Sequence, residues 1–106
     1  MIMIARDLLI ITGENKISII NVINYKPVRN IDVSGAFGIY SVCIINRNIL
    51  LTGDAIGILR QWRIENDNLI LVSKKEKAHD YAITSLVNLG NGHIASGSWD
   101  HRIQIW

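Results

Sequence analysis

Cysteine, proline and phenylalanine each occur only once among the 106 residues, and these scarcities restrict the class of protein. A single cysteine, Cys43, cannot form an intramolecular disulfide, so an intramolecular disulfide framework is excluded, and the sequence is compatible with a reducing compartment. Cys43 lies in the apolar run 42–45, where a buried thiol is expected rather than a nucleophile. The single proline, Pro27, precedes an expected strand, where the loss of one N–H donor does little harm.

The sequence also lacks an excess of charge of one sign. Eleven Lys and Arg residues stand against nine Asp and Glu residues, a formal charge of +2. The densest basic run, residues 74–77, is interrupted by Glu76 and is expected to be a solvated loop. We therefore expect no nucleic-acid partner.

No long hydrophobic run is present either. The longest uncharged stretch, residues 33–46, is too short to span a bilayer. The first residues lack a basic segment, and Arg6 and Asp7 interrupt the apolar run that follows Met1, so no secretory signal is indicated. We expect no membrane contact and a cytoplasmic location, with which a nuclear location is also compatible.

What the sequence does contain is a repeat. Residues 39–62 lie on residues 83–106 without a gap, at a distance of 44 residues. Four identical anchors superimpose, namely Ile39 on Ile83, Ser41 on Ser85, Gly53 on Gly97 and Trp62 on Trp106. Residues 1–13 lie on residues 41–53 in the same gapless way. A period of about 40–44 residues with short strands is typical of a propeller blade.

Short apolar segments rich in β-branched residues alternate with turns of Asn, Asp and Gly, which predicts strands joined by tight turns. The expected strands cover residues 8–12, 17–22, 28–33, 39–45, 49–52, 58–64, 69–74, 83–89, 94–98 and 102–106. Many short strands in sequence indicate an all-β protein of antiparallel meanders.

Residues 78–106 resemble a WD repeat of the β-propeller family. Ala78-His79 stands where the family has Gly-His, and Ser96-Gly97-Ser98, Asp100 and Trp106 follow in the family's order. Residues 50–62 resemble the second half of another such repeat, and residues 8–20 resemble a degenerate third copy.

The resemblance implies an all-β, WD40-type β-propeller fragment of four-stranded antiparallel blades. Residues 1–33 would be an incomplete first blade, residues 34–77 a complete second blade, and residues 78–106 a third repeat that lacks its outer strand. Because Met1 aligns within a strand and Trp106 closes a third strand, we expect a piece of a longer propeller or a chain that assembles with copies of itself.

In WD repeats a His, a Ser or Thr, an Asp and a Trp form a hydrogen-bonded tetrad. The resemblance assigns these roles to His79, Ser96, Asp100 and Trp106, and such a network would satisfy each buried polar group in turn. The middle repeat keeps Thr52 and Trp62, but Gly35 and Ile56 replace its His and Asp. We therefore expect the second blade to rely on packing alone.

His79, Ser96 and Asp100 also permit a catalytic-triad interpretation, which we reject. No Gly-x-Ser-x-Gly elbow surrounds Ser96, and the repeat accounts for all three residues. His93 and His101 lack the close Cys or carboxylate companions of a metal site. We expect no enzyme activity, no cofactor and no metal.

Candidate partner-binding residues come from the loops that enter the first strand and join the second strand to the third, where partners of this family commonly dock. These loops supply Phe37, Tyr81 and Trp99, and Phe37 and Tyr81 are equivalent under the 44-residue shift. Packing between blades is an alternative role for Phe37 and Tyr81. We expect a scaffold that binds a protein or peptide; the alternative is the substrate-recognition or adaptor part of an enzyme complex such as a ubiquitin ligase.

Overall fold

The computed structural model describes residues 2–5 and 7–106 of the chain. In these residues the elements are all β-strands, and no α-helix of membrane-spanning length and apolarity is present. The strands are β1 (Ile2–Ala5), β2 (Leu8–Thr12), β3 (Lys16–Asn21), β4 (Pro27–Asp32), β5 (Ile39–Asn46), β6 (Ile49–Asp54), β7 (Leu59–Glu65), β8 (Asn68–Lys75), β9 (Ile83–Gly90), β10 (His93–Ser98) and β11 (Ile103–Ile105).

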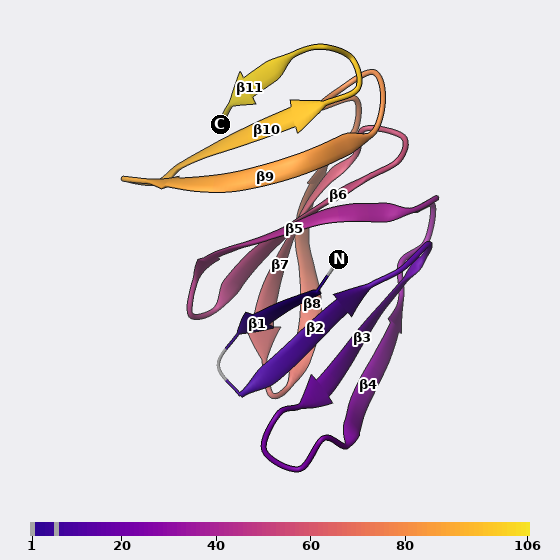
Figure 1. Ribbon diagram of the computed structural model, residues 1–106, viewed down its shortest axis with the longest axis vertical. Coiled ribbons are helices and arrows are strands. Elements are labelled where there is room, and N and C mark those ends of the chain that lie inside the picture. The colour runs from indigo at the N-terminus through magenta and orange to yellow at the C-terminus, as the bar shows by residue number, and fades with distance from the viewer. Residues whose placement is uncertain (1, 6) are drawn as a thin grey trace.

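The strands form three antiparallel sheets that follow one another along the longest axis of the molecule (Figure 1). The first sheet has the order β1-β2-β3-β4, the second β5-β6-β7-β8, and the third β9-β10-β11. Each strand pairs with its neighbour in the sequence, so every sheet is a meander of hairpins. The expected all-β architecture of antiparallel blades is confirmed.

The turns have the chemistry that the sequence indicates. In the β7–β8 turn Asn66 and Asp67 have φ angles of 52° and 58°. Glu65 pairs with Asn68 across this turn, so two residues with positive φ join the strands. Asn and Asp tolerate this left-handed conformation, which matches the twist of the flanking strands.

The larger hydrophobic core lies between the first and second sheets. Its members are buried aliphatic side chains of both sheets together with one indole: Leu8, Ile10, Ile17, Ile19, Val33, Ala36, Ile39, Val42, Leu50, Trp62, Ile64 and Leu69. In β2 and β3 the buried side chains alternate with partly buried or exposed ones, the period of a strand with one covered face. Large side chains from both sheets thus exclude water from this interface.

A smaller core joins the second and third sheets. Leu51 and Leu59 of the second sheet belong to the same buried cluster as Ile83 and Ile94 of the third. At one end of the interface, the side-chain amide of Asn88 donates to the Ile45 carbonyl at 3.0 Å. The two sheets therefore contact each other through aliphatic packing and a polar contact.

At the other end of this interface Gly57 contacts the loop that precedes β9. The His79 N–H donates to the Gly57 carbonyl at 3.2 Å. Gly57 has a φ of 86°, and a Cβ there would overlap the backbone carbonyl of His79. Only glycine fits this approach between the two sheets.

The gapless alignment of residues 1–13 with residues 41–53 does not hold side chain by side chain. The alignment places Ile10 on Leu50. Ile10 of the first sheet projects toward the second sheet, whereas Leu50 of the second sheet projects back toward the first, because both are buried in the core between these sheets. The Thr12 side chain projects in the same direction as that of Ile10, because its hydroxyl donates to the Ile39 carbonyl of the second sheet at 3.0 Å. A shift of one residue moves every side chain of a strand to the other face, and β2 is shifted in this sense.

The outward face of the third sheet remains exposed. Leu51 and Leu59 cover the third sheet from the second, and their counterparts 44 residues later are Ala95 and Ile103. Ile103 is 78% exposed. Three further large aliphatic side chains of this sheet are exposed, namely Val87, Leu89 and Ile105.

Candidate functional site

Four side chains of the third sheet form a continuous chain of hydrogen bonds. His79 lies in the loop before β9, Ser96 in β10, Asp100 in the turn between β10 and β11, and Trp106 directly after β11. His79 Nδ1 is 2.8 Å from Asp100 Oδ2, and His79 Nε2 is 2.7 Å from Ser96 Oγ. Trp106 Nε1 is 2.9 Å from the same Ser96 oxygen. The structure thus brings together all four residues that the resemblance assigns to the tetrad.

The donor and acceptor roles in this chain follow from the chemistry of its members. The indole N–H of Trp106 can only donate, so Ser96 Oγ accepts from it and donates its own proton to His79 Nε2. His79 Nδ1–H then donates to the Asp100 carboxylate, a tautomer assigned from the network. Each polar group has a partner, which is the condition for burying it without loss of stability.

The Asp100 carboxylate also orders the loops around it. It accepts the Asp80 N–H at 3.1 Å and the Arg102 N–H at 2.9 Å. Burial alone would raise the pKa of Asp100, but the hydrogen bond from His79 and the two backbone N–H groups outweigh it and lower the pKa to about 2. The network therefore favours the ionised carboxylate.

Asp100 should make stability depend on pH in the acid range. Its folded-state pKa of about 2 lies below the usual value near 3.9, so its contribution is present above that usual pKa and is lost as the pH falls toward 2. We expect Asp100→Asn to be destabilising near neutral pH, and the difference from the wild type to shrink as the pH falls from about 5 to 2. Urea unfolding at a series of pH values measures this.

The exposed carboxylate of Asp32, in a long contact of 3.9 Å with Lys16, provides the control. Asp32→Asn should change stability little at any pH. A difference between wild type and Asp100→Asn that stays constant across the acid range would contradict the assigned network.

Asp100, His79 and Ser96 are hydrogen-bonded in the order of a catalytic triad, but their surroundings differ from those of an active site. Ser96 is buried, and its hydroxyl is already engaged by both His79 and Trp106. A nucleophile must be reached by its substrate, so this serine is placed for structure. Within the described residues no three His, Cys, Asp or Glu side chains are grouped to hold a metal ion.

The expectation that the second blade relies on packing alone is wrong. Asp54 at the end of β6 and Arg60 in β7 form a buried ion pair with 2.6 Å between Arg60 Nη1 and Asp54 Oδ2. The other oxygen of Asp54 accepts the N–H groups of Ile56 at 3.1 Å and Ile58 at 2.9 Å, which shapes the β6–β7 turn. A buried charge is tolerated when it is paired and hydrogen-bonded in this way.

Arg60 reaches the loop from which the histidine is missing. Its Nη2 donates to the Ser34 carbonyl at 3.2 Å and lies 3.8 Å from where a Cβ on Gly35 would be. Gly35 is the counterpart of His79 under the 44-residue shift. The guanidinium therefore joins the β6–β7 hairpin to the entry loop of its sheet, as His79 does in the third sheet.

The other half of the tetrad is retained in the second sheet. Trp62 Nε1 donates to Thr52 Oγ1 at 3.0 Å, the counterpart of the bond between Trp106 and Ser96. Asp54 and Arg60 align with Ser98 and Gln104 rather than with tetrad residues, so the repeat comparison missed them. The available signal was that they are the only two charged residues in the apolar segment 50–62.

Breaking the Asp54–Arg60 pair should destabilise the protein strongly. Arg60→Met leaves the buried Asp54 carboxylate without its cation, which should lower the free energy of unfolding by about 3–5 kcal/mol. The double variant Asp54→Asn/Arg60→Met should recover much of this loss, because the neutral amide oxygen can still accept the turn N–H groups. Urea unfolding of the single and double variants measures the coupling.

Arg63 offers a matched control, since its ion pair with Glu65 is about half exposed on both sides. Arg63→Met should change the free energy of unfolding by about 1 kcal/mol or less. Equal effects of Arg60→Met and Arg63→Met would show that the buried pair is not structural.

Four exposed aromatic residues lie at one end of the sheets, and we call them the aromatic face: Phe37, Tyr81 and Trp99 in loops and Tyr40 near the start of β5. Phe37, Tyr81 and Trp99 are 69%, 63% and 64% exposed. Phe37 and Tyr81 therefore do not fill the space between blades, the alternative role that their repeat positions allow. All three candidate residues are open to solvent.

Tyr40 joins this group from β5 and was not predicted. Its ring centroid lies 6.0 Å from that of Trp99, with 50° between the ring planes. Tyr40 is 44% exposed, and its counterpart in the third sheet is Thr84. An aromatic contact thus spans the second and third sheets, within the separation typical of tilted aromatic pairs.

Hydrogen bonds to two backbone carbonyls join the loops that carry Trp99 and Tyr81. The Trp99 N–H donates to the Ala82 carbonyl at 3.1 Å, and the Ser98 hydroxyl donates to the Tyr81 carbonyl at 3.3 Å. The Asp100 carboxylate joins the same two loops through His79 and Asp80. The tetrad therefore holds the part of the aromatic face that belongs to the third sheet.

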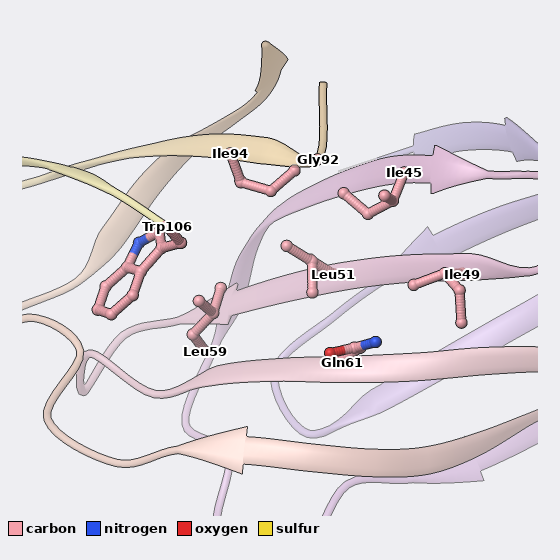
Figure 2. Close-up of a pocket in the computed structure, with 8 residues that line it drawn as sticks. All are labelled: Ile45, Ile49, Leu51, Leu59, Gln61, Gly92, Ile94 and Trp106. Carbon is pink, nitrogen blue, oxygen red and sulfur yellow. The ribbon is translucent and has the colours of Figure 1, made fainter. Parts of the chain in front are cut away.

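A separate cavity of about 260 Å³ lies between the second and third sheets. Figure 2 shows its wall, with Leu51, Leu59 and Gln61 on the second sheet and Trp106 and Ile94 on the third. Lys75 lies over the Trp106 ring, with Nζ 5.3 Å from the centroid. Gln61 is the one side chain of the lining that is neither aliphatic nor aromatic, so the lining is mostly apolar.

No protein-family model matches this sequence, and no curated protein matches it. Among solved structures 133 chains match. One is the WD40 β-propeller domain of Doa1, with a TM-score of 0.76, 19% sequence identity and 93% of this chain covered. The match takes in 32% of that chain, so this chain spans about a third of its length. The chain has the fold of a WD40 β-propeller segment, as the resemblance implies.

Proposed function

We propose that this chain is part of a non-enzymatic scaffold that binds a protein or peptide through the aromatic face. The supporting observation is that Trp99 is largely exposed while its backbone is fixed by hydrogen bonds. Aromatic anchors of this kind bury a large area on docking and lose little conformational entropy. The WD40 fold agrees with this role by analogy, and the aromatic face supplies the physical argument.

Trp99→Ala tests this function directly. We expect an almost unchanged melting temperature in the intact propeller, because the indole is mostly outside the core. Binding of the partner should weaken by roughly 2 kcal/mol or more, as for other aromatic hot spots. Thermal unfolding and quantitative capture of partners from cell lysate measure the two effects.

Tyr25 is the matched control, because it is an exposed aromatic residue in the β3–β4 turn at the opposite end of the first sheet. Tyr25→Ala should leave capture unchanged. A large fall in melting temperature for Trp99→Ala, or undiminished capture, would remove Trp99 from the binding surface.

The scaffold also requires further blades. We propose that another four-stranded sheet covers the outward face of the third sheet, either from additional repeats or from a second copy of the chain. The support is the repeat itself: positions that are buried in the second sheet are exposed in the third, as with Leu59 and Ile103. Exposed aliphatic sheet faces and open edges favour association.

A charge on this face should reduce association of the chain of residues 1–106. Burial of one isoleucine contributes about 1.5–3 kcal/mol, so Ile103→Lys should weaken self-association at least about tenfold in sedimentation equilibrium. Ile23 is 73% exposed in the β3–β4 turn, and Ile23→Lys is the matched control. A stably folded wild-type monomer at all concentrations would contradict the proposal.

A further inference from the structure

The orientation of the Trp99 ring is the starting point for the chemistry of the partner. Its backbone N–H is held by the Ala82 carbonyl, and its ring contacts Tyr40 on one side. Because 64% of the residue is exposed, at least one face of the ring is open to solvent. One face of the indole is therefore presented to the partner in a defined orientation.

An exposed indole face attracts cations in particular. The face of an aromatic ring is electron-rich, and tryptophan is the strongest cation–π partner among the side chains. Because the Tyr40 ring lies on one side of the indole, with 6.0 Å between the two centroids, a cation is expected over the other face, within about 6 Å of the Trp99 centroid. This attraction needs no cavity and so suits a surface built from loops.

An exposed acidic residue, Asp80, lies in the loop that borders the turn carrying Trp99. The Asp80 N–H donates to Asp100 Oδ2, which places Asp80 beside the turn that carries Trp99. Asp80 is exposed, and the ion pairs of the described residues do not include it. Asp100, by contrast, is occupied by His79 and the turn N–H groups.

We propose that the partner presents a lysine or arginine side chain, whose cation binds over the open face of Trp99 with Asp80 as its counter-charge. This inference rests on the proposed scaffold function and specifies its ligand class as a cationic protein segment. Tyr40 contacts the other side of the indole and positions it. Neither Tyr40 nor Asp80 is indicated by the repeat pattern.

The loop 76–82 also contains Glu76, which pairs with Lys74 of β8. The remaining charges of the two loops, Lys77 and Arg102 against Asp80 and Asp100, balance in formal charge. A general negative field therefore does not attract the cation, and the attraction must be local to the Trp99 ring and the Asp80 carboxylate. Arg102 is exposed and would repel an approaching cation. Its removal is thus informative about the sign of the partner's charge.

Short peptides test the proposal on the intact protein. The probes are capped five-residue peptides of glycine with a central lysine, arginine or norleucine, of which norleucine keeps the aliphatic chain of lysine without its charge. Titrations are followed by the NMR signals of the Trp99 indole N–H and the Tyr40 ring. The lysine and arginine peptides should bind about 5- to 30-fold more tightly than the norleucine peptide.

Three variants identify the groups responsible. Trp99→Leu keeps an apolar surface but removes the aromatic face, so it should abolish the preference for the charged peptides, as seen at the Tyr40 signal. Asp80→Asn should reduce that preference and its dependence on salt. Arg102→Gln should leave binding of the lysine peptide unchanged or tighter, whereas an anionic partner would require Arg102.

The outcomes separate this inference from the function on which it rests. Equal binding of the norleucine and lysine peptides, or no shift of the Trp99 signal with any peptide, overturns the cationic ligand. Loss of lysate capture in Trp99→Ala together with either result would leave the scaffold function standing with a ligand of other chemistry. Undiminished capture in Trp99→Ala would remove both proposals.

Discussion

Face-to-face packing of consecutive sheets is the interaction on which the rest of this structure depends. A sheet that is aliphatic on both faces cannot remain in water on either side, so each blade requires a neighbour. Leu50 and Leu51 illustrate this, because these adjacent residues of β6 enter two different cores. The second sheet is consequently the only one described with both faces covered, and it holds the other two in place.

Polar networks add the loops to this packed framework. In the third sheet His79 and Asp100 join the entry loop to the β10–β11 turn, and in the second sheet Arg60 joins the corresponding loop and turn. The two solutions use different residues for the same mechanical task. Each keeps every buried charge or hydroxyl paired, so loops that carry exposed aromatic residues can be rigid without a covalent cross-link.

The sequence predicts the parts of this structure that the period determines. Ten strands lie within a few residues of their expected positions, because alternating aliphatic residues and Asn, Asp or Gly turns are local signals. Strand β1 is absent from the strands expected from local patterns, although the alignment of Met1 with Ser41 places the first residues in the remainder of a first strand. The gapless alignment of residues 1–13 with residues 41–53 does not reproduce the faces of β2, because such an alignment cannot detect a shift of one residue.

In the candidate site, too, some residues could be predicted from the sequence and others could not. The tetrad follows from residue types at family spacing, and the structure places its four members within hydrogen-bonding distance. Arg60 and Tyr40 could not be found by comparing repeats, because each has a counterpart of different chemistry. Their roles depend on which side chains meet across a turn or across two sheets, which is tertiary information.

The close approach of Gly57 to the His79 backbone has a mechanical consequence. Together with the Asn88 contact at the other end of the interface, it joins the second and third sheets at two widely separated points. Opening of the two sheets as a hinge about one end would therefore break the contact at the other end. These two contacts also oppose separation of Tyr40 from Trp99, which come from different sheets, so a partner that contacts both would bind a surface that one sheet alone does not provide.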